Sequence, residues 1–306
     1  LATSVDTMIP AIKESLLGHF MPEVLLCVAA CVVLLGDLLL KKSWSRLLAF
    51  PTMLALGGAL LLTAQQGGRA EPGLWFSGLI ADDPFAQFFK ALFLLGTGAV
   101  VHMSYHARSL DDVRMGEYYS LMLCSVVGMC VMASATDFLM VFIGIELVSL
   151  PSYALVGYRH TDRQGTEASL KYVLYGAFSA GAMLLGVSFI YGLTGTTKLT
   201  GIATLLATAN AEQTLLLSVA SLLVFGGYAY KLAAAPFHFW APDVYQGAPT
   251  PITAWLSVAS KAAGVAAFVR FVLAFESTGY RFGSFDWQVV LSVIAALTMT
   301  IGNVSA

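Results

Sequence analysis

The sequence Lys231-Leu-Ala-Ala-Ala-Pro-Phe-His-Phe-Trp-Ala-Pro-Asp-Val-Tyr-Gln-Gly-Ala-Pro-Thr-Pro251 follows a long apolar run and combines a lysine with four prolines. Because Pro236 has no amide proton, the carbonyl group of Leu232 loses its helical hydrogen bond one residue beyond Lys231. Within a membrane, an interrupted helix is tolerated only where it lines a cavity or is buried in protein. Broken helices of this kind form ion sites in transporters. The stretch therefore predicts a broken helix beside a polar cavity.

The composition around this stretch is that of a membrane protein. The 306 residues are 58% hydrophobic and only 11% charged, whereas globular chains carry about 25% charged residues. The net charge of -2 shows no basic excess, which argues against nucleic acid as a partner. The apolar runs are continuous rather than alternating, which favours helices over a β-barrel. We therefore expect an all-α polytopic membrane protein.

The sequence contains nine runs that approach the length of about 20 apolar residues needed to cross a bilayer. They cover residues 22–40, 47–64, 84–105, 117–135, 137–158, 168–195, 214–247, 251–275 and 286–306. The first run is directly followed by others, so we do not interpret it as a secretory signal peptide. Because the chain begins with Leu1 and ends inside an apolar run, we expect it to be part of a longer polypeptide.

The basic residues of the short loops predict the orientation of the chain in the membrane. Alternate loops carry two unequal sets, one of seven residues and one of four. The larger set is Lys41, Lys42, Arg46, Arg108, Arg114, Arg159 and Arg163, and the smaller is Lys13, Arg69, Lys198 and Arg281. We expect the larger set on the cytoplasmic or matrix side, which places the amino terminus on the outer side.

The four cysteines do not predict a metal centre. Cys27, Cys31, Cys124 and Cys130 all lie in apolar runs and lack the paired CxxC spacing of zinc and iron–sulfur sites. The sequence also lacks a complete glycine-rich dinucleotide loop. We therefore predict no flavin, nicotinamide or metal site in this chain and expect any redox chemistry in other chains.

Three charged residues lie deep within the apolar runs: Glu146, Lys231 and Lys261. An Asp, Lys or Arg at the centre of a membrane helix costs about 2.5 to 3.5 kcal/mol on insertion scales, so such charges mark functional sites. If Glu146 forms an ion pair with one of the two lysines, the other lysine has no carboxylate partner and must be neutral or hydrated. Small neighbours around Lys261 leave room for water. We interpret the three residues as a proton relay rather than as a structural ion pair.

Three further residues are open to two interpretations. Lys171 and Lys90 lie nearer the ends of their runs, where a long side chain can reach the interface without any other role. His238 follows the predicted break and is either a member of the relay or a packed ring at the kink.

Three motifs carry a resemblance to a known family: the stretch from Lys231 to Pro251, Gly144-Ile-Glu-Leu-Val-Ser-Leu-Pro151 and Ala259-Ser-Lys-Ala-Ala263. From about residue 80 onward the chain resembles the antiporter-like membrane subunits of proton-pumping NADH:quinone oxidoreductase, respiratory complex I. It resembles the N type (NADH dehydrogenase subunit 2), because the L and M types usually have Leu-Pro-Asp-Ala after the tryptophan, where this chain has Ala-Pro-Asp-Val-Tyr-Gln-Gly.

The resemblance implies a fold and a role for each candidate residue. The family has two inverted repeats of five helices, each with a broken helix, in a bundle of about fourteen helices. This implies one membrane domain over residues 1–306: N-terminal helices to about 115, a first repeat over 116–276 with its broken helix at 214–247, and an incomplete second repeat from 286. Glu146 and Lys231 correspond to the family's variable ion pair, Lys261 to the next relay lysine, and Lys171 and His238 to neighbours of the pair. The terminal lysine on the family's twelfth helix has no counterpart here.

The resemblance also implies a function, partners and a location. Quinone reduction elsewhere in the complex would weaken the Glu146–Lys231 pair and pass a proton to Lys261. Flavin, iron–sulfur clusters and quinone would be bound by partner subunits. The neighbours would be M-type and K-type membrane subunits and lipids, in a bacterial inner membrane or a mitochondrial one. Three alternatives stay open: a subunit of a sodium/proton antiporter, a subunit of an energy-converting hydrogenase, and a scaffold that moves no protons.

Overall fold

The computed structural model describes residues 18–67, 73–206, 211–276 and 287–305, which form a helical bundle. Short 3₁₀ segments at Lys42–Leu48 and Arg108–Leu110 and one hairpin of strands β1 (Gly73–Trp75) and β2 (Ile80–Asp82) join the helices. The helices are α2 (Met21–Leu39), α3 (Ala49–Gly67), α4 (Pro84–His106), α5 (Met115–Ser134), α6 (Phe138–Val156), α7 (Arg163–Thr194), α8 (Leu199–Leu206), α9 (Ala211–Leu232), α10 (Trp240–Gly247), α11 (Thr250–Trp255), α12 (Lys261–Glu276) and α13 (Trp287–Ser305).

The prediction of an all-α polytopic protein is confirmed. Within the described residues, eight segments are long and apolar enough to cross a membrane. The ninth predicted run forms α13, whose described apolar part, Gln288–Val304, is shorter than the other eight. The predicted run 214–247 is one helix, α9, followed by a break and the short helix α10.

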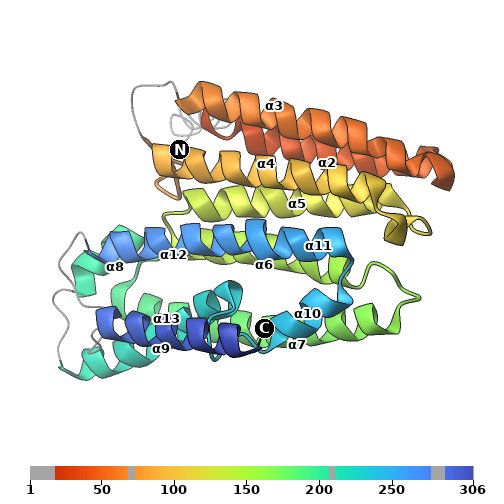
Figure 1. Ribbon diagram of the computed structural model, residues 1–306. Coiled ribbons are helices and arrows are strands. Elements are labelled where there is room, and N and C mark those ends of the chain that lie inside the picture. The colour runs from red at the N-terminus through yellow and green to blue at the C-terminus, as the bar shows by residue number, and fades with distance from the viewer. Residues whose placement is uncertain (1–17, 68–72, 207–210, 277–286, 306) are drawn as a thin grey trace.

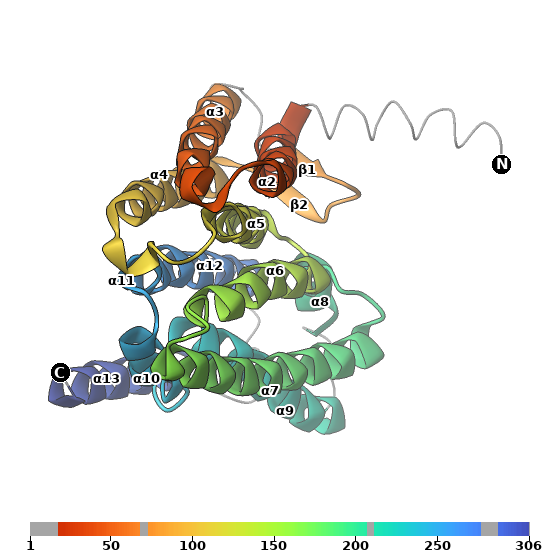
Figure 2. The ribbon, with the colours of Figure 1, turned by 90° about the vertical axis from the view of Figure 1, so that its right-hand side faces the viewer.

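The long helices lie roughly side by side in layers (Figure 1). Helices α2, α3 and α4 lie against one side of α5, and α6 and α12 lie on its other side (Figures 1 and 2). Helices α7, α9, α10 and α13 form the layer farthest from α2 (Figure 2). Helix α5 is the most enclosed span of the described residues, because 83% of its most apolar stretch is buried inside the protein. It therefore forms the centre around which the other helices pack.

Small residues let α5 and α6 approach each other closely. A Cβ atom at Gly128 of α5 would lie 2.8 Å from the backbone nitrogen of Val148 on α6. In the reverse direction, a Cβ atom at Gly144 would lie 2.8 Å from Cγ of Met132. Membrane helices gain stability from such close packing, because the lipid tails are as apolar as the side chains. These two glycines therefore set the distance between the central helices.

An arginine clamp joins the ends of three helices. Arg270 of α12 donates two hydrogen bonds of 2.9 Å to the carboxylate of Asp83 and one to the carbonyl of Ala133 at the end of α5. Asp83 also accepts a hydrogen bond from the amide of Ala86, which caps α4. Partial burial works to raise the pKa of Asp83, but the hydrogen bonds from Arg270 and from the amide of Ala86, together with the neighbouring positive charges, lower the pKa below its ordinary value.

The interruption after α9 agrees with the predicted broken helix. Helix α9 ends at Leu232, and Ala233 adopts a positive φ of 52°. A second irregularity was not predicted from the sequence: a π-helical turn, η3 (Leu256–Ser260), separates α11 from α12 directly before Lys261. Single π turns inside helices are frequent at functional sites.

We expect the substitution Gly128→Ala in the full-length protein to destabilise the bundle by about 1 to 3 kcal/mol, because the added methyl group would overlap the backbone of α6. The melting temperature of the detergent-solubilised protein would measure this. Gly181→Ala is the matched control, since a Cβ atom there meets nothing within 4 Å. Equal melting temperatures for the two variants would contradict this account of the α5–α6 contact.

Candidate functional site

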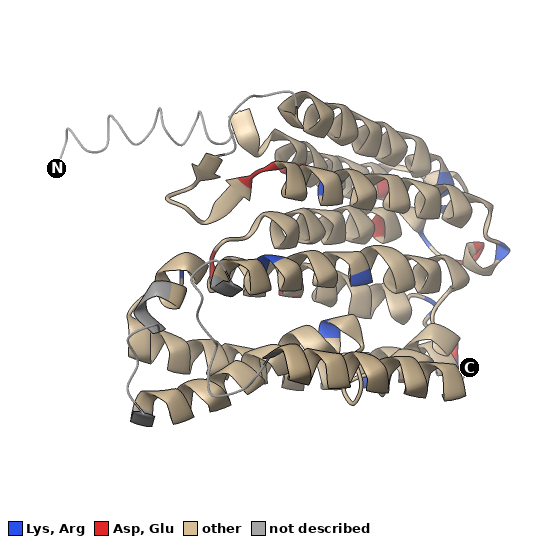
Figure 3. Cartoon of the chain, turned by 60° about the vertical axis from the view of Figure 1, so that its left-hand side comes forward, with Lys and Arg blue, Asp and Glu red and all other residues tan. Residues whose placement is uncertain are grey.

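Charged residues are sparse along the helices (Figure 3). Three of the predicted site residues come from three different helices: Glu146 from the middle of α6, Lys231 from the last turn of α9 and Lys261 from the start of α12. Lys231 is 3% exposed, and Glu146 is partly buried.

The ammonium group of Lys231 contacts a hydroxyl group rather than a carboxylate. Its Nζ donates a hydrogen bond of 3.2 Å to Oγ of Ser149. Ser149 in turn donates to the carbonyl of Ile145, so its oxygen lone pairs are free to accept from the lysine. Glu146 lies three residues before Ser149, on the same side of α6, and makes no direct ion pair with Lys231 among the contacts of the described residues. Within the described residues, the hydrogen-bond partner of the Lys231 ammonium group is therefore Ser149, one turn from Glu146 on α6.

Glu146 lines a small cavity together with several hydroxyl-bearing side chains. The cavity measures about 10 Å³, and its lining includes Ser149, Tyr153, Ser179 and Tyr230 as well as Glu146. This volume is close to the minimum that one water molecule requires. Gly176 of α7 makes the cavity possible, because a Cβ atom there would overlap the hydroxyl group of Tyr153. The arrangement provides hydroxyl groups beside a carboxylate, which is the chemistry of a short proton path.

The break after α9 is held by hydrogen bonds to the groups that the helix no longer pairs. The carbonyl of Tyr230 accepts from the amide of Ala233 and from Nε1 of Trp240, at 2.9 and 3.2 Å. The amide of Ala235 donates to Oγ1 of Thr298 on α13, at 2.9 Å. The Trp240 ring also stacks on Tyr172 of α7, with 4.6 Å between the ring centroids. The irregular backbone is therefore enclosed in protein, as its position in a membrane helix requires.

Lys261 has an aromatic neighbour and no hydrogen-bond acceptor among the described residues. Its buried Nζ lies 4.4 Å from the centroid of the Trp240 ring and 5.9 Å from that of Tyr245. Lys261 and Gly264 lie one turn apart on α12, and a Cβ atom at Gly264 would lie 3.2 Å from Cγ of Lys231. The absence of a side chain at Gly264 thus lets the stem of Lys231 pack against the turn of α12 that begins at Lys261.

Lys171 and His238 lie apart from these contacts. Nζ of Lys171 pairs with Asp243 of α10 at 2.6 Å and with Glu167 at 2.9 Å, and its side chain is 40% exposed. His238 stacks on Phe239, and its buried Nδ1 has no hydrogen-bond partner among the described residues. The structure thus places Lys171 in an ion-pair network between α7 and α10, and His238 in the break.

Sequence reasoning did not find Ser149, Trp240 or Tyr245 as neighbours of the lysines. The position of Ser149 could have been predicted, because a residue three positions after Glu146 lies on the same face of the helix. Trp240 and Tyr245 could not be predicted in this way, since their contact with Lys261 depends on how α10 folds back after the break. The sequence also gave no role to Glu23, which pairs with Lys90 in the N-terminal helices.

Comparison with known proteins agrees with the fold and the motifs. The chain is 42% identical over 99% of its length to NADH-quinone oxidoreductase subunit N of Anaeromyxobacter sp. (strain Fw109-5), and covers 62% of that protein. It is 47% identical over 77% of its length to subunit N 2 of Chloroherpeton thalassium, and covers 47% of that protein. The chain therefore spans about half to three fifths of the length of these relatives.

Two solved structures share the architecture. A chain of respiratory complex I from Thermus thermophilus superimposes with a TM-score of 0.74 and 32% identity, over 93% of this chain and 58% of that one. A chain of the archaeal membrane-bound sulfane sulfur reductase superimposes with a TM-score of 0.71 and 25% identity, over 90% of this chain and 57% of that one. Residues 135–306 match the family described as NADH:quinone oxidoreductase/Mrp antiporter, TM. Since this match covers more than half of the chain, the protein belongs to that family of integral membrane proteins.

Proposed function

We propose that the chain is the N-type antiporter-like subunit of a proton-pumping NADH:quinone oxidoreductase and that it carries protons through Glu146, Lys231 and Lys261. The observation that carries the proposal is the environment of Lys231. Its ammonium group is 3% exposed, lies at the end of a broken helix and has a neutral hydroxyl, Ser149, as its hydrogen-bond partner. A cation whose direct hydrogen-bond partner is a neutral hydroxyl is costly to bury, so its retention supports a role in proton transfer.

The contacts support the following sequence of steps. Lys231 holds a proton while the nearby carboxylate of Glu146 favours its charged form. When energy from quinone reduction in partner subunits moves that carboxylate away, the proton leaves Lys231. Lys261 is the next acceptor, because the stem of Lys231 packs against the turn of α12 that begins with Lys261. Lys261 has no acceptor of its own among the described residues, so water beside the Trp240 ring completes its hydration and passes the proton onward.

The proposal includes the surroundings of the subunit. The NADH and quinone chemistry, with its flavin and iron–sulfur clusters, would take place in other subunits. The membrane neighbours would be M-type and K-type subunits together with lipids. The excess of basic residues in the loops that contain Arg46, Arg114 and Arg159 supports an orientation with the amino terminus on the outer side, and the membrane would be a bacterial inner membrane. A mitochondrial inner membrane would give the same orientation, with the matrix in place of the cytoplasm.

A sodium/proton antiporter subunit is the second candidate function, because the matched family includes antiporters. The two functions differ in their requirement for NADH. If the complex that contains this chain exchanged sodium for protons across vesicles without NADH or quinone, the antiporter would be favoured. Proton movement that requires NADH and is indifferent to sodium would favour the oxidoreductase.

In the full-length subunit within its complex, we expect Lys231→Ala to lower the number of protons moved per electron, because the chain would lose its central proton carrier. Proton uptake and NADH oxidation, measured together in reconstituted vesicles, give this ratio. Lys198→Gln is the control, since Lys198 is an exposed lysine that bonds to the carbonyl of Ser77. An unchanged ratio in Lys231→Ala would falsify the proposed role.

The ion pair of Lys171 with Asp243 makes it possible to test whether Lys171 takes part in proton transfer or only stabilises the fold. Because both side chains are more than a third exposed, solvent screens the pair, and Lys171→Gln should lower the melting temperature only slightly. The exchanged pair Lys171→Asp with Asp243→Lys should recover the melting temperature in part, because the introduced aspartate lies four residues from Glu167. If Lys171 is a relay member, as the family resemblance implies, the exchanged pair will still move fewer protons per electron. A normal ratio in that variant would assign Lys171 a structural role only.

A further inference from the structure

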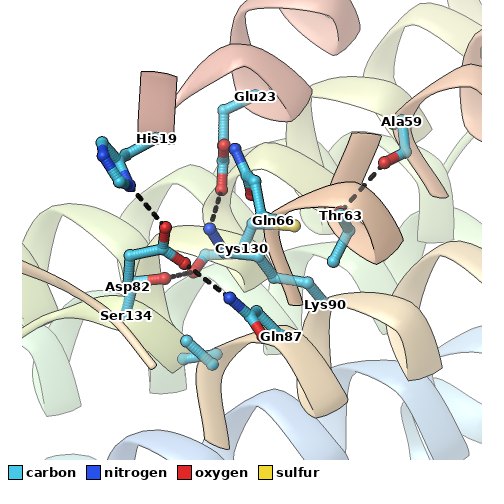
Figure 4. Close-up of polar contacts among 12 residues, drawn as sticks. His19, Glu23, Ala59, Thr63, Gln66, Asp82, Gln87, Lys90, Cys130 and Ser134 are labelled. Carbon is cyan, nitrogen blue, oxygen red and sulfur yellow. Dashed lines mark hydrogen bonds and ion pairs between the residues drawn. The ribbon is translucent and has the colours of Figure 1, made fainter. Parts of the chain in front are cut away.

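A second buried polar cluster lies among the N-terminal helices, away from the relay. It brings together Glu23 of α2, Gln66 of α3, Asp82 at the end of β2 and Lys90 of α4, with His19 just before α2 (Figure 4). The cluster lies at the end of the bundle where the β hairpin joins α3 to α4. The relay does not use any of these residues.

The centre of the cluster is an ion pair that is almost fully enclosed. Nζ of Lys90 lies 2.7 Å from Oε1 of Glu23, and the side chains are 1% and 0% exposed. Burying both charges costs several kcal/mol for each ion, which their attraction recovers only partly. An apolar pair of similar volume would hold α2 to α4 as well. Helix packing alone therefore does not explain why a buried ion pair is present here.

Some acceptor atoms of the cluster have no hydrogen-bond donor among the described residues. Oε2 of Glu23 and Oε1 of Gln66 are buried and receive no hydrogen bond from the described residues. Gln66 is 3% exposed and extends toward Glu23 and Lys90 (Figure 4). Buried acceptors of this kind are completed by water or by an added proton, because an unsatisfied buried oxygen is costly. A metal cation is disfavoured beside the Lys90 ammonium, so water and protons fit the site best.

Asp82 and His19 connect the cluster to the surface. Nδ1 of His19 lies 2.6 Å from Oδ2 of Asp82, and Gln87 donates to the other oxygen of that carboxylate at 3.1 Å. His19 is 15% exposed and stacks on Trp75, with 3.6 Å between the ring centroids. Cys130 of α5 lies beside these groups (Figure 4). The groups thus form a series from Lys90 to a partly exposed imidazole.

The net charge of these groups can be balanced by one additional proton. Two carboxylates, Glu23 and Asp82, face one ammonium, so the group is negative while His19 is neutral and balanced when His19 is protonated. Histidine is the side chain that gains and loses a proton most readily near neutral pH. The next charged groups, Asp83 and Arg270, neutralise each other in the clamp.

The opposite end of α2 offers a comparison. Asp37 is 1% exposed there and pairs with an arginine, Arg114, which also donates to the carbonyl of Asp37. An arginine in a protein does not release its proton, so that pair is suited only to holding helices together. Glu23 instead has a lysine, which can give up its proton when buried.

We infer that Glu23, Lys90, Asp82 and His19 form a second proton-exchange site, which carries protons between the interior of the N-terminal helices and the membrane surface at the hairpin. In the forward step an N–H bond of the Lys90 ammonium breaks and an O–H bond forms on Glu23. The proton then passes through water to the carboxylate of Asp82 and to the imidazole of His19, which releases it to solvent. A proton taken up by His19 and passed back along the same groups restores the Lys90 ammonium. The inference rests on the proposed function, because it requires a chain that moves protons.

Lys90→Arg in the assembled complex separates proton exchange from a structural role. Arginine keeps the positive charge and the ion pair with Glu23 but cannot release the proton. We expect it to lower the protons moved per electron as far as Lys231→Ala does in the same complex. Arg114→Lys is the matched control at the other end of α2 and should leave the ratio unchanged.

A second variant covers the case in which arginine does not fit and the complex fails to assemble. His19→Phe keeps a ring on Trp75 and removes the proton carrier nearest the surface. We expect normal amounts of complex, measured by native electrophoresis, and a lowered ratio of protons to electrons. A structural role of the cluster would leave this ratio as in the unaltered protein.

The outcomes distinguish this inference from the function on which it rests. If Lys231→Ala lowers the ratio while Lys90→Arg or His19→Phe does not, the cluster is structural and the inference is wrong, but the proposed function stands. If Lys231→Ala also leaves the ratio unchanged, the proposed function and the inference are both wrong. A lowered ratio in Lys231→Ala and in the cluster variants, with Arg114→Lys normal, supports both.

Discussion

A lysine ammonium group that leaves water must find acceptors inside the protein, and this requirement governs the arrangement of the bundle. Lys231 finds one hydroxyl, Lys90 finds a carboxylate, and Lys261 has the face of an indole ring. In each of these three contacts, the lysine and its partner come from two different helices. The ends of the long helices must therefore be placed so that these groups meet, and the interruptions of the helices follow from the same need.

The two irregular segments lie on either side of α10 and serve the same pair of lysines. The break after Leu232 frees the carbonyl of Tyr230, which binds the indole N–H of Trp240 and fixes the ring over Lys261. The π turn at Leu256–Ser260 directly precedes Lys261 and so affects the rotation of α12 at that position. Glycines complete the arrangement, because Gly176 and Gly264 leave space for Tyr153 and for the stem of Lys231. Conformational irregularity, small residues and buried charge are thus concentrated in one region.

Much of this could be predicted from the sequence, and the parts that could not share a physical reason. The spans, the broken helix and the depth of Glu146, Lys231 and Lys261 follow from local hydropathy and from proline chemistry, which do not depend on distant contacts. The partner of Lys171 could not be predicted, because Asp243 lies 72 residues away and meets it only after α10 folds back on α7. Glu23 is near the end of its run, where a charged residue is ordinary, and only the approach of Lys90 from α4 shows that it is buried. Ser149 as the partner of Lys231 likewise depends on how α9 packs against α6.

The hydrogen bond between the amide of Ala235 and Thr298 has a mechanical consequence. Thr298 lies on α13 and is itself held by its bond to the carbonyl of Ile294, so the hydroxyl cannot follow the break independently of its helix. A sliding of α13 along its axis by a fraction of one helical turn would detach the only amide of the break that is anchored outside α9 and α10 among the described contacts. The region between Leu232 and Trp240 is therefore tied to α13 as well as to its own helices, so a shift of α13 would act directly on the backbone beside the carbonyl that positions Trp240.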